Sequence, residues 1–195
     1  VYKRQIHASG DSIPGRELDI HVVETDRGQR FFFDADDGVH GRELWVSDGT
    51  SIGTTMLGDM ESGDAIGWNS EVTTWMNGVV FTTNGQQGNR MWWSNGSVTT
   101  SIWQAPWFSA SASSDLINQS AAITSIGQGL LQGDASGLWF AAKETQIGLE
   151  MMHLDNNGTL HMFDLQPFGD SSPSRGVSVD GGYVVVASDG TGRQL

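Results

Sequence analysis

The chain has 195 residues, among them 26 glycines, eight tryptophans and no cysteine, and its formal net charge is −13. This acidity argues against a nucleic-acid partner and against electrostatic adhesion to an anionic membrane, because both require a basic surface. The lack of cysteine excludes disulfides, thiol catalysis and cysteine-ligated zinc. The sequence has no run of about 18 apolar residues, so no membrane insertion is predicted.

The N-terminal residues VYKRQ resemble the translated remnant of a sequencing adapter, as found at the ends of metagenomic assemblies. We therefore expect residues 1–5 to be non-native and exclude them from the fold prediction. Residues 6–16 are expected to be a loop or the tail of a preceding repeat. On this interpretation the chain is a metagenomic fragment, and its true N-terminus and any signal peptide lie outside it.

Residues 17–64 contain short apolar segments separated by turns rich in aspartate and glycine. Alternation of apolar and polar residues in these segments predicts β-strands. The dipeptide Asp48-Gly49 is the strongest hairpin signal among the turns. Strands are expected at 18–23, 30–35, 43–46 and 54–58, which together make one antiparallel meander.

The same pattern recurs downstream. Val79–Thr82 aligns with Phe31–Asp34 at a shift of 48 residues, and residues 88–97 align with 41–50 at a shift of 47. A third copy follows a longer gap in which the strand register is ambiguous, and a fourth copy is incomplete. The predicted copies cover 17–64, 70–108, 120–169 and, in part, 175–195.

A period of roughly 45–60 residues with short strands in each copy is typical of β-propeller blades. The predicted fold is therefore all-β, a propeller-like repeat of four-stranded antiparallel blades that forms an incomplete propeller. Neighbouring blades of the same parent chain are its expected packing partners. A β-sandwich is the alternative, because strands spaced every 8–12 residues also fit that fold.

The first copy resembles the ELWxxDGT repeat, which occurs in tandem in large secreted or cell-surface proteins of bacteria and archaea. Later copies depart from the motif, with Arg90 in place of its glutamate and Met151-Met152 in place of Leu-Trp. The resemblance implies a propeller-like extracellular or cell-surface protein with an interaction role, and it implies no reaction. The matching positions are Phe33, Ala35, Asp37, Gly38, Gly41, Glu43 to Trp45, Ser47 to Thr50, Gly53, Thr54 and Asp59.

An acidic turn in the first copy is a candidate calcium site. Asp34, Asp36 and Asp37 offer oxygen ligands at nearby positions, as calcium loops do. The turn lacks the downstream bidentate glutamate of an EF-hand loop. Because aspartate and glycine also favour tight turns, the alternative role of these residues is purely structural. Calcium is the one cofactor that the sequence suggests.

Tryptophans are concentrated in the second copy. Trp92, Trp93, Trp103 and Trp107 are candidate ligand-binding residues, because aromatic rings can stack on sugars and so bind a glycan. Trp92 and Trp93 are adjacent, so they must face opposite sides if their segment is a strand. Packing between blades is the alternative role for these rings.

No catalytic motif is present, and His153 and His161 become neighbours only if the hairpin register pairs them. The function that the sequence favours is a binding scaffold for a protein or glycan partner. Two alternatives stay open. One is a part of a glycan-active propeller hydrolase whose catalytic residues lie outside this chain, and the other is a purely structural spacer.

Overall fold

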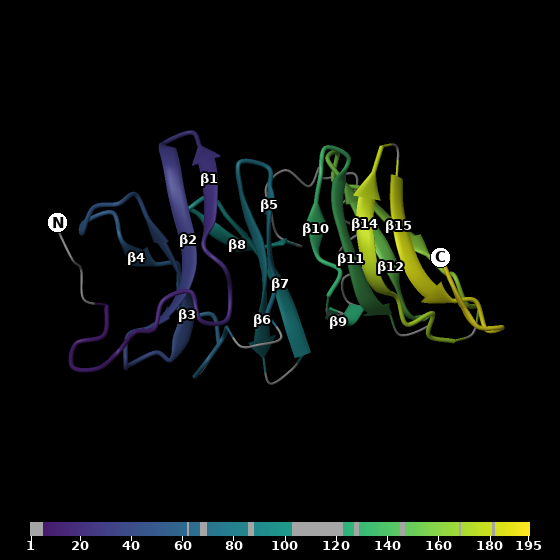
Figure 1. Ribbon diagram of the computed structural model, residues 1–195, viewed down its shortest axis with the longest axis horizontal. Helices are drawn as coiled ribbons and strands as arrows, with labels where there is room; N and C mark the ends of the chain where they lie inside the picture. Colours follow the sequence, from purple (N-terminus) through teal and green to yellow (C-terminus); the bar gives the residue numbers. More distant parts are fainter. Residues whose placement is uncertain are drawn as a thin grey trace. The chain divides into compact units, whose positions relative to one another are not determined.

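The computed structural model describes residues 6–61, 63–66, 70–85, 88–102, 123–126, 129–144, 147–167, 169–180 and 182–195 (Figure 1). These residues form antiparallel sheets with no α-helix among them, so the all-β prediction is confirmed. No helix in this part of the chain is long and apolar enough to cross a membrane. The chain divides into two compact units, Val1–Ser101 and Ile102–Leu195, which are described separately.

Unit 1 contains two four-stranded sheets, and in each sheet the strands lie side by side in chain order. Sheet 1 consists of β1 (His21–Thr25), β2 (Gly28–Asp36), β3 (Arg42–Ser47) and β4 (Thr55–Met56). Sheet 2 consists of β5 (Val72–Trp75), β6 (Gly78–Gly85), β7 (Gly88–Ser94) and β8 (Thr99–Ser101). Both are the antiparallel meanders expected from the strand and turn pattern.

Unit 2 contains a five-stranded sheet 3 and a three-stranded sheet 4. Sheet 3 consists of β9 (Ile123–Ile126), β10 (Gln132–Gly133), β11 (Gly137–Glu144), β12 (Gly148–Asp155) and β13 (Leu160–Phe163). Sheet 4 consists of β14 (Ser174–Val179), β15 (Gly182–Ser188) and β16 (Arg193–Gln194). Strands β9 and β10 both pair antiparallel with β11, so two short strands share the first position of sheet 3.

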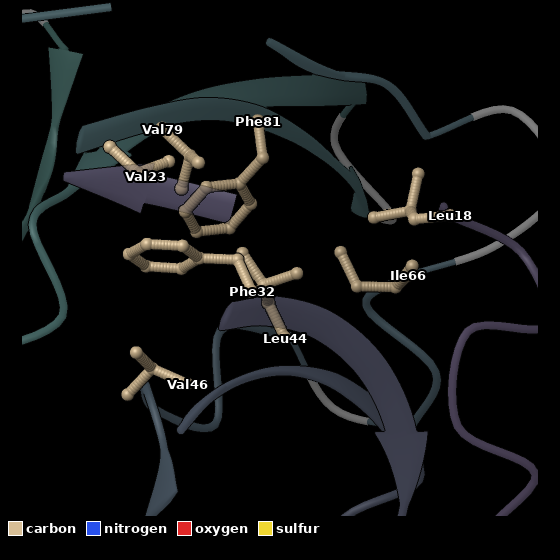
Figure 2. Close-up of a cluster of buried hydrophobic side chains, with 8 residues drawn as sticks. All are labelled: Leu18, Val23, Phe32, Leu44, Val46, Ile66, Val79 and Phe81. Carbon is tan, nitrogen blue, oxygen red and sulfur yellow. The ribbon is translucent and has the colours of Figure 1, made fainter. Parts of the chain in front are cut away.

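The core of unit 1 lies between its two sheets (Figure 2). Phe32, Leu44 and Val46 alternate onto one face of sheet 1, and Val79 and Phe81 meet them from sheet 2. Phe32, Val79 and Phe81 are all 0% exposed. Burying an aromatic or aliphatic side chain of this kind contributes about 1.5–3 kcal/mol, so this interface is a main source of stability in unit 1.

Unit 2 packs the corresponding faces of its sheets. Met151 of sheet 3 stands at the repeat position of Leu44, and Val185 of sheet 4 stands at that of Phe81. Met151 belongs to a buried cluster against which Tyr183 and Val185 pack. In both units, therefore, the first sheet contributes the face that carries Leu44 or Met151. The second sheet contributes its other face, the one that carries Phe81 or Val185.

Replacing Phe81 by alanine should lower the free energy of unfolding of unit 1 by about 3–5 kcal/mol, because it opens a cavity between the sheets. Urea unfolding followed by tryptophan fluorescence measures the change. Ile52→Ala is the control, since Ile52 is 91% exposed and its loss should change stability by less than about 0.5 kcal/mol. Equal losses in the two variants would contradict this assignment of the core.

Candidate functional site

The predicted calcium ligand Asp34 is completely buried in sheet 1. Its carboxylate forms an ion pair with Arg42 of the neighbouring strand. It also accepts the backbone N–H of Leu18 at 2.9 Å and that of Glu17 at 3.2 Å. Arg42 in turn donates from Nη1 to the carbonyl oxygen of Ile13 at 3.0 Å. Asp34 thereby binds the N-terminal segment to sheet 1.

The other two predicted calcium ligands hold the turn between β2 and β3. Asp36 Oδ1 accepts the N–H of Gly38 at 2.7 Å, and Asp37 Oδ1 accepts those of Val39 and His40 at 2.9 Å. The backbone hydrogen bond from His40 contributes most to lowering the pKa of Asp37 to about 2. The imidazole of His40 lies 2.7 Å from Asp37 Oδ2, and this hydrogen bond raises the pKa of His40. Calcium binding by these three aspartates stays a prediction.

The two adjacent tryptophans lie on opposite faces of β7. Trp92 is half-buried, packs against the unit 1 core and donates from Nε1 to Thr83 Oγ1 at 3.1 Å. Trp93 is 8% exposed and donates from Nε1 to the carbonyl oxygen of Trp75 at 3.2 Å. Ligand binding by these two rings stays a prediction. Trp103 and Trp107 lie outside the described residues.

A hollow of about 510 Å³ opens between sheets 3 and 4 in unit 2. It combines hydroxyl, carboxylate and imidazole groups with aromatic rings, and no lysine or arginine is among its described lining residues. The lining residues are Asp134, Ala135, Ser136, Trp139, His153, Ser178, Val179, Asp180 and Gly182. They come from the β10–β11 turn, from β11 and β12, and from the β14–β15 hairpin.

Stacked rings form one wall of this hollow. The ring centroids of Trp139 and His153 are 4.0 Å apart, and those of Trp139 and Tyr183 are 5.0 Å apart. His153 and His161 are direct cross-strand partners with centroids 5.8 Å apart, so the hairpin register does pair them. Aromatic stacking of this kind contributes about 0.5–1.5 kcal/mol beyond the area it buries.

Asp134 organises the polar wall. Its Oδ1 accepts hydrogen bonds from Ser136 N at 2.7 Å, Ser136 Oγ at 2.6 Å and Gly137 N at 3.1 Å. Its Oδ2 accepts hydrogen bonds from Trp139 Nε1 at 3.1 Å and from the hydroxyl of Ser178. Burial raises the pKa of Asp134, but hydrogen bonds from Ser136, Ser178 and Gly137 outweigh it and lower the pKa to about 2. The carboxylate is therefore ionised and ties sheet 3 to sheet 4.

The hollow does not have the geometry of a serine hydrolase. Ser136 Oγ lies 3.3 Å from His153 Nε2, which is close to the distance expected of a nucleophile and its base. Asp134, however, binds the serine hydroxyl, whereas a catalytic triad uses its carboxylate to orient the imidazole. The arrangement is suited to binding. The sequence did not predict this hollow, because residues that meet in it, such as Asp134 and Ser178, are 44 residues apart in the chain.

Each unit also contains a buried glutamate at the same repeat position, Glu43 on β3 and Glu150 on β12, and both are 0% exposed. Glu150 Oε2 accepts the N–H of Leu165 at 3.0 Å, and its Oε1 accepts that of Ser171 at 2.9 Å. Glu43 Oε2 accepts the N–H of Met60 at 3.4 Å. Each carboxylate thus holds the segment that leaves the fourth strand of its sheet.

A second acidic residue reinforces this connection in both units. Asp64 Oδ1 accepts the N–H of Arg42 at 2.7 Å, and Asp170 Oδ1 accepts the N–H of Leu149 at 2.9 Å. Gly41 has φ +83°, and a Cβ built on it would lie 2.6 Å from the backbone of Gly63. The glycine of the G-x-E sequence is therefore required by this close approach.

The chain has no match among family models, curated proteins or solved structures. The resemblance to the ELWxxDGT repeat therefore stays an expectation, based on the motif residues of the first copy.

Burial raises the pKa of Glu43 to about 8, with further contributions from the charges of Asp59, Glu61 and Asp64. The folded chain then binds a proton between about pH 4.5 and pH 8 that the unfolded chain releases, so stability must fall as pH rises through this range. We expect the free energy of unfolding, measured in EDTA, to fall by at least about 1.4 kcal/mol between pH 5 and pH 8. This decrease should be smaller in Glu43→Gln.

Glu24→Gln, which changes an exposed glutamate on β1, is the matched control and should retain the wild-type pH dependence. Identical pH profiles for wild type and Glu43→Gln would contradict the assigned burial of this carboxyl group.

His153 should titrate below the ordinary pKa of histidine. Burial lowers its pKa, and the neighbouring His161 lowers it further. In an NMR titration of the imidazole signals, His161→Gln should raise the pKa of His153, because the variant removes a like charge. An unchanged or lower pKa would show that the two rings do not interact in solution.

Proposed function

We propose that this chain belongs to a β-propeller-like repeat protein at the cell surface or in the extracellular space, and that it binds a glycan partner. The hollow in unit 2 supports this proposal most directly. It is open to solvent, the rings of Trp139 and His153 stack along one wall, and Asp134 accepts hydrogen bonds from Ser136 and Ser178. Its volume of about 510 Å³ falls within the range of about 300–1,000 Å³ typical of ligand sites.

The stacking of the sheets supports the propeller-like architecture. In both units a preceding sheet offers the Leu44 or Met151 face, and the following sheet offers the Phe81 or Val185 face. Contacts between two different faces generate a ring or an open helical array when they are repeated. Propellers use about 4–8 blades of this four-stranded kind to close the ring.

The chemistry of the hollow favours a neutral, hydroxyl-rich ligand. Ser136, Ser178 and His153 provide hydrogen-bonding groups, and Asp180 provides an exposed carboxylate acceptor. An anionic ligand is disfavoured because two carboxylates and no lysine or arginine are among the described lining residues. A sugar residue meets these requirements, since each hydroxyl both donates and accepts hydrogen bonds. A polar protein segment is the alternative occupant.

A glycan array probed with the whole chain tests the proposal, followed by calorimetric titration of the glycans that bind. Asp180→Asn and Ser136→Ala should each weaken binding about tenfold, the equivalent of about one lost hydrogen bond. Both positions are exposed, so neither change threatens the core.

Ser97→Ala is the matched control, because Ser97 is also an exposed serine whose N–H binds the side-chain oxygen two residues before it, that of Asn95, and it lies outside the hollow. It should bind like the wild type. If Asp180→Asn and Ser136→Ala leave glycan binding unchanged, the glycan binds outside the hollow. An array with no binding would argue against a glycan partner.

A further inference from the structure

Two buried carboxylate oxygens in unit 1 have no hydrogen-bond partner in the described part of the chain, Glu43 Oε1 and Glu61 Oε1. Arg90 Nε is 3.6 Å from Glu61 Oε1, which is beyond hydrogen-bonding distance. Leaving a buried charged oxygen without a partner is costly, and such oxygens commonly mark a bound ion or water. Both oxygens belong to the connection between β3 and the segment that follows β4.

Unit 2 provides an internal comparison, because Glu150 occupies the same repeat position as Glu43. Both oxygens of Glu150 accept backbone N–H groups. Gln166 occupies the position that Glu61 has in unit 1. In unit 1 the N–H of Met60 binds Glu43, and Glu61 is the next residue. In unit 2 the N–H of Leu165 binds Glu150, and Gln166 is the next residue. At this position unit 1 therefore has a carboxylate where unit 2 has an amide, and its buried glutamate has one fewer N–H donor.

The surrounding charges are also those of a cation site. Asp59 and Glu61 flank Met60, whose N–H binds Glu43 Oε2, and Asp64 binds the N–H of Arg42, the residue before Glu43. Asp64 uses only Oδ1, as the acceptor for Arg42 N–H, in the hydrogen bonds described for it. Asp59 is exposed and offers a route for an ion from solvent.

We propose that unit 1 binds a calcium ion between Glu43 and the acidic segment 59–64, with Glu43 Oε1 and Glu61 Oε1 as its central ligands. Asp59 and Asp64 complete the oxygen shell. Calcium accepts six to eight oxygen ligands in irregular geometry, whereas magnesium requires a near-octahedral arrangement that an irregular segment rarely provides.

Binding requires a local rearrangement. As arranged in the structure, no three acidic or histidine side chains among the described residues have metal-ligating geometry. Asp59 and Glu61 must therefore rotate toward Glu43 when the ion enters.

Titration of the EDTA-treated whole chain with CaCl₂ tests this inference, with melting temperature and binding heat as readouts. The melting temperature should rise saturably, by about 3 °C or more at a calcium concentration well above the dissociation constant. Glu61→Gln should weaken calcium binding at least about tenfold, and Asp59→Asn should weaken it by a smaller factor. Glu43→Gln, which replaces the other central ligand, should also weaken calcium binding at least about tenfold.

Two variants serve as controls. Asp164→Asn changes the unit 2 counterpart of Asp59 and should leave calcium binding unchanged. Asp36→Asn tests the acidic turn between β2 and β3 and should also have no effect. The inference is overturned if calcium produces neither heat nor a change in melting temperature, if Asp36→Asn abolishes binding while Glu61→Gln does not, or if magnesium and calcium act equally.

Discussion

A buried glutamate on the third strand of sheet 1, and another on the third strand of sheet 3, holds the segment that leads to the next sheet of its unit. Glu43 and Glu150 are both fully buried, and each accepts backbone N–H groups from the segment that follows the fourth strand. Without this connection the segment would be free to leave the sheet, and the next sheet would lose its fixed starting point. The cost of burying a carboxylate is offset by hydrogen bonds in Glu150 and only partly in Glu43.

Glu43 and Glu150 occupy equivalent positions, but their carboxylates differ in hydrogen-bond partners. In unit 2 the carboxylate is saturated by N–H donors and acts as a structural acceptor. In unit 1 the same carboxylate keeps one unpartnered oxygen and faces extra negative charge from Glu61. The sheets of the two units share an antiparallel meander while these side-chain environments differ. The hollow is likewise lined by residues of unit 2.

Much of the fold could be predicted from local sequence. Strand alternation and Asp-Gly turns identify the meanders, and the G-x-E and S-D-G-T positions give the repeat. Sequence reasoning also anticipated that Asp36 and Asp37 could serve as turn formers, and both accept the backbone N–H groups of their own turn. Local sequence patterns could not predict that two short strands, β9 and β10, share the first position of sheet 3. That arrangement is visible only from their pairing with the same strand, β11.

The candidate sites depended on contacts between distant residues. Asp34 is a calcium candidate in the sequence, and the structure pairs it with Arg42 of the neighbouring strand. Trp92 is a candidate platform in the sequence, and the structure packs it against the unit 1 core. The sequence by itself determined strands, turns and their repetition, since these follow from backbone preferences and side-chain alternation over a few residues. The tertiary structure decided which carboxylates are buried, which oxygens lack partners and where a hollow opens. Those properties depend on the faces that the sheets present to one another, and residues far apart in the chain meet there.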